Sequence, residues 1–193
     1  MSSPPEPPPR LGPAHRAFDT LYPAIRFTYE RLFAHAWFSR VTPQLWIGGA
    51  PTYQRDHDTL LAVGITGVLD MRAERAADLA FYDAHGIVHR RFRVPDVGVP
   101  DEATLTAAVD WLDAQVEDGR TVLVHCAKGR GRSATVLAGY LMREEGMTFD
   151  EASALLRSKR SLVKLQDRHR LVLESWIATQ AVDRQRPGAL TKS

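Results

Sequence analysis

The sequence contains a single cysteine, Cys126, among its 193 residues. One thiol cannot form an intrachain disulfide, so the chain is not a disulfide-stapled scaffold and fits a reducing compartment. Only four of the 25 cationic residues are lysines, and the net charge of +2 gives no electrostatic case for binding nucleic acid. The seven histidines are scattered and form no metal-ligand pattern, so we expect neither a metal nor another cofactor.

A long hydrophobic run is also missing from the sequence. No uninterrupted apolar segment approaches the roughly 18 residues needed to span a bilayer, and residues 1–10 lack the apolar core of a secretory signal. We therefore expect a cytoplasmic protein. The hydrophobic content of 44% and charged content of 25% are typical of a globular domain. We expect one domain over residues 14–182, between a disordered proline-rich tail at 1–13 and a disordered tail at 183–193.

Short apolar runs alternate with helical patterns along this domain. The runs predict strands at 45–47, 65–71, 87–94 and 121–124. Caps and apolar spacing predict helices at 52–61, 74–84, 101–118 and 134–142. A fifth helix is predicted to begin at the Thr148–Glu151 capping box, and a sixth at Gln166 or Asp167. In the last helix we expect the large apolar residues to face inward: Leu171, Val172, Leu173, Trp176 and Ile177. This alternation predicts an α/β fold with a central, mainly parallel sheet flanked by helices.

Residues 22–38 form an aromatic-rich segment with mostly helical apolar spacing. One interpretation is a helix packed on the domain. The other is a helix at a membrane surface, with Arg26, Arg31 and Arg40 toward lipid headgroups, which would be a peripheral membrane contact. Packing is favoured because Glu30 and His35 interrupt a clean amphipathic pattern.

The loop between the strand at 121–124 and the helix at 134–142 holds Cys126, two glycines and three basic residues. A strand, a glycine-bearing loop and a helix N-terminus form an anion site, because main-chain N–H groups point inward and the helix dipole favours negative charge. A free thiol has a pKa of about 8.5, which such surroundings can lower by several units. We therefore expect Cys126 to be a thiolate at neutral pH.

Two residues at the end of this loop complete the expected chemistry. The planar guanidinium of Arg132 can bind two phosphate oxygens at once, and Ser133 can donate a hydrogen bond to the cysteine sulfur. The remaining loop residues are the predicted substrate-binding residues: His125, Ala127, Lys128, Gly129, Arg130 and Gly131. Lys128 and Arg130 favour a highly charged substrate.

The pattern His125-Cys126-x5-Arg132-Ser133 resembles the signature loop of the cysteine-dependent protein tyrosine and dual-specificity phosphatases. Further similarity, from residues 22–37 through 45–51 and 84–87 to Ile177, points to the branch containing the mitochondrial and plant phosphatidylglycerophosphate phosphatases. The resemblance implies a dual-specificity phosphatase-like fold, phosphoryl transfer to Cys126, and hydrolysis of the resulting thiophosphate. Members of the branch act on phosphoproteins, anionic phospholipids or both, so either is the expected substrate, with no obligate protein partner.

The reaction needs a proton donor for the departing oxygen. Asp96 lies in the loop 94–101, thirty residues before Cys126, on the side where the resembled phosphatases carry their general acid. We assign it that role. Asp101 is the competitor, although its position predicts a helix cap.

Three alternatives remain open at this stage. The protein could be a catalytically inactive phosphate-binding module, or a rhodanese-like or arsenate-reductase-like thiol enzyme.

A basic run follows the capping-box helix. Its cationic residues either steer an anionic substrate or form a solvated face: Arg157, Lys159, Arg160 and Lys164.

Overall fold

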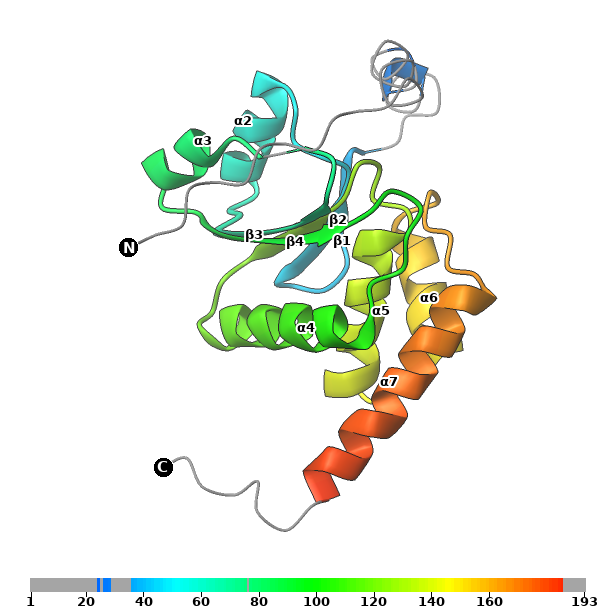
Figure 1. Cartoon of the computed structure of the whole chain (residues 1–193). Coiled ribbons are helices and arrows are strands. Elements are labelled where there is room, and N and C mark those ends of the chain that lie inside the picture. Colours follow the sequence, from blue (N-terminus) through cyan, green and yellow to red (C-terminus); the bar gives the residue numbers. More distant parts are fainter. Residues whose placement is uncertain (1–23, 25, 29–35, 76, 186–193) are drawn as a thin grey trace.

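The computed structural model describes residues 24, 26–28, 36–75 and 77–185, and shows a five-stranded sheet between two layers of helices (Figure 1). The strands are β1 (Phe38–Arg40), β2 (Leu45–Gly48), β3 (Gly67–Arg72), β4 (Val88–Val94) and β5 (Val122–His125). The helices are α2 (Gln54–Ala62), α3 (Leu79–Ala84), α4 (Glu102–Glu117), α5 (Arg132–Glu144), α6 (Phe149–Lys159) and α7 (Asp167–Gln185).

The sheet has the strand order β1-β2-β5-β3-β4. β2, β5, β3 and β4 run parallel to one another, and only β1, which pairs with β2, is antiparallel. The central strand β5 and its neighbour β3 are buried along their whole length, as expected for strands covered on both faces. The predicted α/β fold with a mainly parallel sheet is therefore confirmed.

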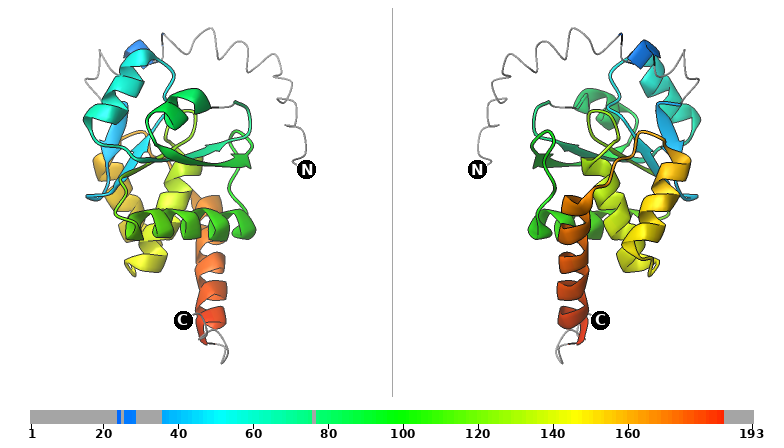
Figure 2. Two further views of the ribbon diagram at one scale, coloured as in Figure 1. Left: turned by 90° about the vertical axis from the view of Figure 1, so that its left-hand side faces the viewer. Right: turned by 90° about the vertical axis from the view of Figure 1, so that its right-hand side faces the viewer.

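The helices divide unequally between the two faces of the sheet. α2 and α3 cover one face, and α4 to α7 cover the other (Figures 1 and 2). α5 packs against α4, α6 and α7, so it is the central helix of the larger layer. The main core cluster, which includes Val124, Leu137 and Trp176, fills this side, and a smaller one around Leu60 and Tyr82 lies under α2 and α3. Burial of α5 fixes the loop that precedes it.

Helix caps show where local sequence signals held. Asp101 accepts a hydrogen bond from the Thr104 amide at 2.8 Å, and Thr148 caps α6 as predicted. The predicted cap at Thr52 is wrong, because α2 begins after Tyr53.

The carboxylate of Asp56 explains the different start of α2. It accepts hydrogen bonds from the main-chain N–H groups of Thr52 and Tyr53, at 2.7 and 2.9 Å. The helix N-terminus is therefore satisfied by a side chain from inside the helix rather than by a threonine hydroxyl before it.

The helix predicted at 74–84 is shorter in the structure, where α3 begins only at Leu79. Asp78 caps it by accepting a hydrogen bond from the Phe81 amide at 3.1 Å. Glu74 therefore lies in the loop that follows β3, which frees its carboxylate for a contact outside the helix.

The expected helix at 22–38 lies mostly outside the described residues, although residues 24, 26 and 27 are helical. Phe38 does not end this helix but opens β1, a three-residue edge strand that the sequence reading missed. Arg26 is 1% exposed, and its guanidinium pairs with the Asp56 carboxylate and stacks over the Trp37 ring at 4.3 Å. It therefore faces the protein and not lipid headgroups.

Arg40, the second cation of the proposed membrane face, lies on β1 and donates hydrogen bonds to the carbonyls of Thr42 and Pro43. Arg31, the third, lies outside the described residues. None of the helices in the described ranges is both long and apolar enough to cross a membrane.

α7 departs from the prediction in one residue. Leu173 and Trp176 are buried and Val172 and Ile177 pack partly against the core, but Leu171 is 68% exposed. A run of three apolar residues covers more of a helix than its inward face, so one must point outward.

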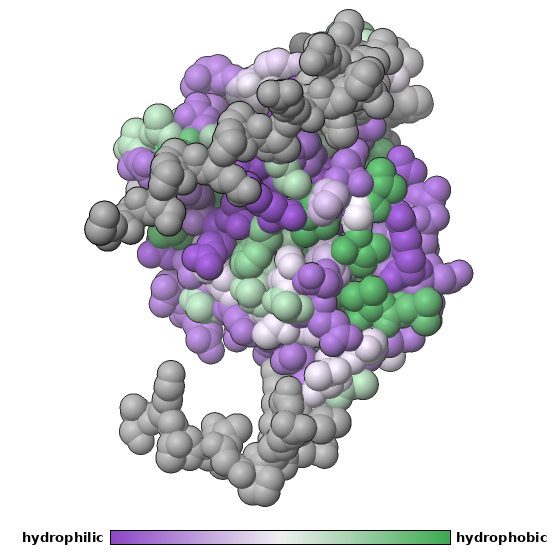
Figure 3. Space-filling model, in the orientation of Figure 1, coloured by the Kyte–Doolittle hydropathy of each residue, from purple (hydrophilic) through white to green (hydrophobic). Residues whose placement is uncertain are grey.

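The view in Figure 3 is mostly hydrophilic, with hydrophobic residues gathered on the side where α6 and α7 lie.

The expected tail boundaries lie largely outside the described residues. Residues 1–13 and 186–193 are not described, and α7 continues to Gln185, past the expected start of the C-terminal tail at residue 183.

Candidate active site

Three loops meet at one edge of the sheet. They follow β3, β4 and β5, and because these strands are parallel, their carboxyl ends share an edge. There the structure has a cavity of about 340 Å³. The residues that line it come from the loop after β4, from the loop after β5 with the first residue of α5, and from the segment before α7 with the first turn of that helix: Asp96, Val97, Gly98, Cys126, Ala127, Lys128, Arg130, Gly131, Arg132, Lys164, Gln166, Arg168 and His169.

Cys126 lies at the base of this cavity and is 3% exposed. The Ser133 hydroxyl lies 3.4 Å from its sulfur, in position to donate a hydrogen bond. Burial alone would raise the pKa of the Cys126 thiol, but the Arg132 charge and hydrogen bonds from Ser133 and the Arg130 amide together hold that pKa below its ordinary value. The surroundings of the sulfur therefore act in the direction of the predicted thiolate.

Arg132, the first residue of α5, is 3% exposed and is held from several sides. Its two terminal nitrogens donate to the two carboxylate oxygens of Glu74, at 2.7 and 2.8 Å. One of them also donates to the Val94 carbonyl at 3.0 Å, and the other to Asp96 at 2.9 Å. Although burial alone would lower the Arg132 pKa, the Glu74 hydrogen bonds and the nearby negative charges raise it. The guanidinium is thus fully charged and fixed in orientation.

Glu74 is the partner that sequence reasoning missed. Burial alone would raise the pKa of its carboxyl, but the hydrogen bonds and charge of Arg132 lower it. The pair joins residues 58 positions apart, so no short motif could reveal it.

The two candidate acids occupy different places. Asp96 lines the cavity, with its side chain 50% exposed, and contacts Arg132. Val97, directly after it, has a φ of 63°, a conformation that is strained for a β-branched residue. Asp101 does not line the cavity, and hydrogen bonding to Thr104 lowers the pKa of its carboxyl. Of the two candidate acids, only Asp96 therefore lies at this cavity.

Four of the six predicted substrate-binding residues line the cavity, namely Ala127, Lys128, Arg130 and Gly131. His125 does not, because its side chain is wholly buried beneath the loop. Its Nδ1 lies 3.8 Å from an oxygen of Asp70, and burial lowers its pKa to about 4, so it is neutral at pH 7. Gly129 also lies outside the lining, with a φ of +64°.

Gln166, just before α7, and two residues in the first turn of that helix, Arg168 and His169, also line the cavity, although the motif did not indicate them. The Nδ1 of His169 accepts a hydrogen bond from the Gln166 amide at 2.9 Å, which leaves Nε2 as its protonated nitrogen when the ring is neutral. Burial lowers the pKa of His169, and Arg168 adds to this effect.

The basic run at 157–164 divides into three groups. Lys164 lines the cavity. Arg157 and Lys159 are exposed on α6. Arg160 is 1% exposed, so it neither steers an anion at the surface nor belongs to a solvated face. Among the described residues, no three His, Cys, Asp or Glu side chains gather to hold a metal ion.

Comparisons with known proteins match this site and fold. Residues 45–177 match the model of the dual specificity phosphatase catalytic domain. The phosphatidylglycerophosphate phosphatase PTPMT2 of Arabidopsis thaliana is 30% identical over 83% of this chain and 71% of its own length. Dual specificity phosphatase 28 of Mus musculus is 33% identical over 66% of this chain and 76% of its own length.

Comparison with solved structures also finds phosphatases of this kind. The solved structure of PTPMT1 in complex with PI(5)P superposes with a TM-score of 0.70 over 77% of this chain and 99% of that one, at 23% identity. The resemblance inferred from the signature loop, including its phosphatidylglycerophosphate phosphatase branch, is confirmed.

Proposed function

Because this chain belongs to the dual-specificity phosphatase family and is a phosphoric monoester hydrolase, we propose that it works through a phosphocysteine intermediate on Cys126. The observation that carries this proposal is the convergence of a buried sulfur, a fixed guanidinium and a carboxylate on one cavity, in Cys126, Arg132 and Asp96.

In the first step, the Cys126 thiolate attacks the phosphorus of the bound monoester. A sulfur–phosphorus bond forms and the phosphorus–oxygen bond to the leaving group breaks. Arg132 and the loop amides stabilise the charge on the equatorial oxygens, and Asp96 donates a proton to the departing oxygen. The Asp96–Arg132 contact at 2.9 Å supports this role, because it holds the carboxyl group next to the guanidinium.

In the second step, water attacks the phosphorus and the sulfur leaves as a thiolate. Asp96, now a carboxylate, accepts a proton from this water. Ser133 donates its hydrogen bond to the departing sulfur from 3.4 Å, which stabilises the charge that develops there. Inorganic phosphate is released and the resting thiolate is restored.

For the substrate, we favour a phosphate monoester that carries a second anionic group, such as an anionic phospholipid. Four cationic residues line the cavity in addition to Arg132, namely Lys128, Arg130, Lys164 and Arg168, which is more charge than a lone phosphate dianion needs. The similarity to a phosphatidylglycerophosphate phosphatase supports the same class. A phosphoprotein is the second candidate, supported by the similarity to dual specificity phosphatase 28.

We also propose a reducing compartment such as the cytoplasm, because the nucleophile must remain a free thiolate. Peripheral contact with a membrane would follow from the lipid substrate, and co-sedimentation with phosphatidylglycerol vesicles measures it.

Phosphate release from an aryl phosphate, with Cys126→Ser as control, tests the reaction. We expect wild-type release and none above background from the variant. An inactive phosphate-binding module would bind phosphate and release none, and a sulfur-transferring enzyme would consume thiosulfate instead. Equal release by both proteins would refute the mechanism.

Asp96→Asn tests the acid, with Asp101→Asn as its matched control. We expect the first substitution to lower turnover about 100- to 1,000-fold while substrate still binds, and the second to affect stability only.

Turnover on phosphatidylglycerophosphate in vesicles, compared with turnover on phosphotyrosine peptides, separates the two substrate classes.

A further inference from the structure

Arg160 is buried beside the phosphate-binding loop but does not line the cavity. It follows the last residue of α6, and its guanidinium donates to two loop carbonyls, those of Lys128 at 2.9 Å and Gly129 at 3.2 Å. It also donates to the carbonyls of Ala36 and Trp37, at 3.2 and 3.0 Å. One side chain thus joins the loop to the segment that enters β1.

The two loop contacts fix the direction of two peptide planes. In a trans peptide the C=O and the N–H of the next residue point in opposite directions. Since the carbonyls of residues 128 and 129 face Arg160, the amides of Gly129 and Arg130 face away from it, toward the sulfur and cavity. The hydrogen bond that the Cys126 sulfur accepts from the Arg130 amide agrees with this direction.

The loop has little room to turn otherwise. A Cβ atom at Gly129 would lie 2.5 Å from the Gly48 carbonyl carbon and oxygen, and 2.8 Å from Nε of Arg160. The peptides at Gly129 are therefore packed between the end of β2 and the guanidinium. Arginine suits this place because its planar group carries five N–H donors in a fixed geometry, which a lysine does not.

The contacts of Arg160 with the carbonyls of Ala36 and Trp37 are made to a segment that is itself held in place. The indole of Trp37 donates to the Ala50 carbonyl at 3.0 Å, and its ring lies so close to Gly49 that a Cβ there would meet it at 2.0 Å. The carbonyls that hold the far side of the guanidinium are therefore fixed with respect to β2, and they fix Arg160 in turn.

We propose that Arg160 is a positioning residue for the active-site loop, which orients the Gly129 and Arg130 amides toward the thiolate and the substrate phosphate. The role rests on the proposed function, in which these amides stabilise both. Arg160 itself touches neither the substrate nor the reacting atoms.

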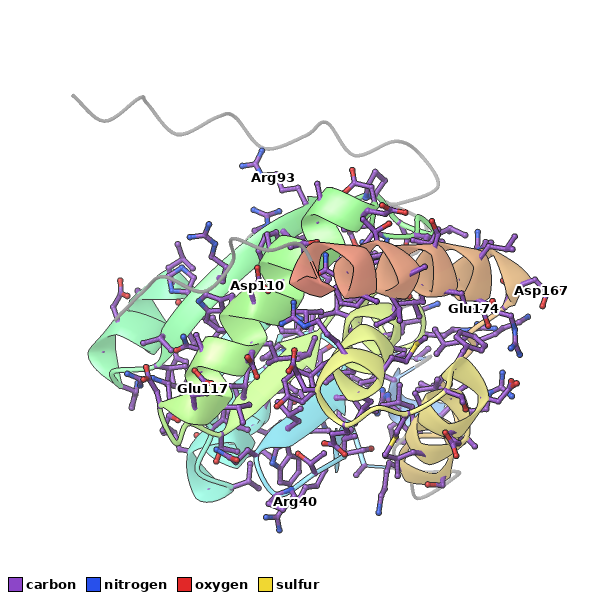
Figure 4. All side chains as sticks on the ribbon, turned by 90° about the horizontal axis from the view of Figure 1, so that it is seen from below. Arg40, Arg93, Asp110, Glu117, Asp167 and Glu174 are labelled. Carbon is purple, nitrogen blue, oxygen red and sulfur yellow. The ribbon has the colours of Figure 1, made fainter. Side chains whose placement is uncertain are left out.

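The test compares Arg160→Lys and Arg160→Gln with wild type, using the full chain. The readouts are the pH dependence of Cys126 alkylation by iodoacetamide, followed by mass spectrometry, and kcat and KM on an aryl phosphate. Arg40→Lys is the matched control, since Arg40 also donates to two carbonyls but lies on the outside of the molecule, away from Asp167 at the start of α7 (Figure 4).

We expect Arg160→Lys to raise the pH midpoint of alkylation by about one pH unit, which is about a tenfold loss of thiolate at pH values well below the midpoint. The value of kcat/KM should fall about tenfold to a hundredfold. Lysine preserves the positive charge, and the charged residues that line the cavity with Cys126 all remain: Asp96, Lys128, Arg130, Arg132, Lys164 and Arg168. The change therefore reports loop geometry. Arg160→Gln should have the larger effect, and Arg40→Lys none.

Two results would overturn the proposal. One is a folded Arg160→Lys protein whose alkylation profile and kcat/KM match wild type. The other is failure of both variants to fold, which would make Arg160 a residue of the whole fold rather than of the loop. Absence of wild-type phosphatase activity would refute the proposed function instead, and the alkylation profiles would still report on Arg160.

Discussion

Replacing Glu74 by glutamine tests the site most directly, because it removes one charge and almost no volume. In the wild type the carboxylate accepts two hydrogen bonds from Arg132, at 2.7 and 2.8 Å. Glutamine keeps one acceptor oxygen and turns its NH2 group, a donor, toward the other guanidinium nitrogen. One charge-assisted hydrogen bond is lost and the other is weakened, while Cys126 and Asp96 are unchanged.

The magnitude follows from these contacts. A hydrogen bond to a charged group contributes about 1.5–3 kcal/mol, and the Glu74 side chain is only 13% exposed, so water screens the pair little. We take about 2–3 kcal/mol as the loss of positioning free energy. If the whole loss appears in the transition state, kcat/KM falls about 30- to 150-fold.

The assay is steady-state hydrolysis of an aryl phosphate at pH 7, with thermal melting to show that the variant is folded. Glu102→Gln is the control, because Glu102 also accepts a side-chain hydrogen bond, from Ser175 at 2.8 Å, but lies on α4. It should leave kcat/KM within about twofold of wild type. A folded Glu74→Gln protein within threefold of wild type would refute the view that this pair orients Arg132.

The same pair predicts a pH dependence of stability. Arg132 lowers the folded-state pKa of Glu74 below its ordinary value of 4.5. Stability from this carboxylate is therefore fully present above the unfolded pKa and is lost as pH falls through the folded pKa. The free energy of unfolding of wild type should fall below about pH 4.5 more steeply than that of Glu74→Gln, as urea titrations at several pH values would show.

Three further predictions follow from single contacts. Ser133→Ala removes the donor to the Cys126 sulfur, so breakdown of the phosphocysteine should slow more than its formation, giving a larger burst in rapid-quench kinetics; an unchanged burst would contradict this. Gly129→Ala places a Cβ at 2.5 Å from Gly48, so phosphate affinity, measured by inhibition of turnover, should fall at least tenfold. Asp56→Asn removes the carboxylate partner of buried Arg26 and should lower the free energy of unfolding by about 3–5 kcal/mol, and a loss below 1 kcal/mol would show that the ion pair contributes little.

Local signals in the sequence predicted most of the fold. The strand β5, the cap at Asp101 and the capping box at Thr148 each depend on residues within one short segment, so their patterns survive without knowledge of the rest of the chain. β1 was missed because three residues at the end of a helical pattern carry no period of their own. The early start predicted for α3 failed for a related reason, since Glu74 fits a helical first turn as well as it fits a loop.

The site divides in the same way. Cys126, Arg132 and Ser133 occupy fixed spacings, so the sequence alone places them in one loop. The residues that hold these groups in place have no fixed spacing from them in the sequence. Glu74 contacts Arg132 from 58 positions away, and Arg160 contacts Gly129 from 31 positions away. Arg160 is the harder case, because it contacts main-chain carbonyls, which every residue type presents. No pairing of side-chain chemistries marks such a contact in a sequence, so a buried arginine that orients a loop reads as one more basic residue in a charged run. Its role follows only from the direction of the peptides it holds.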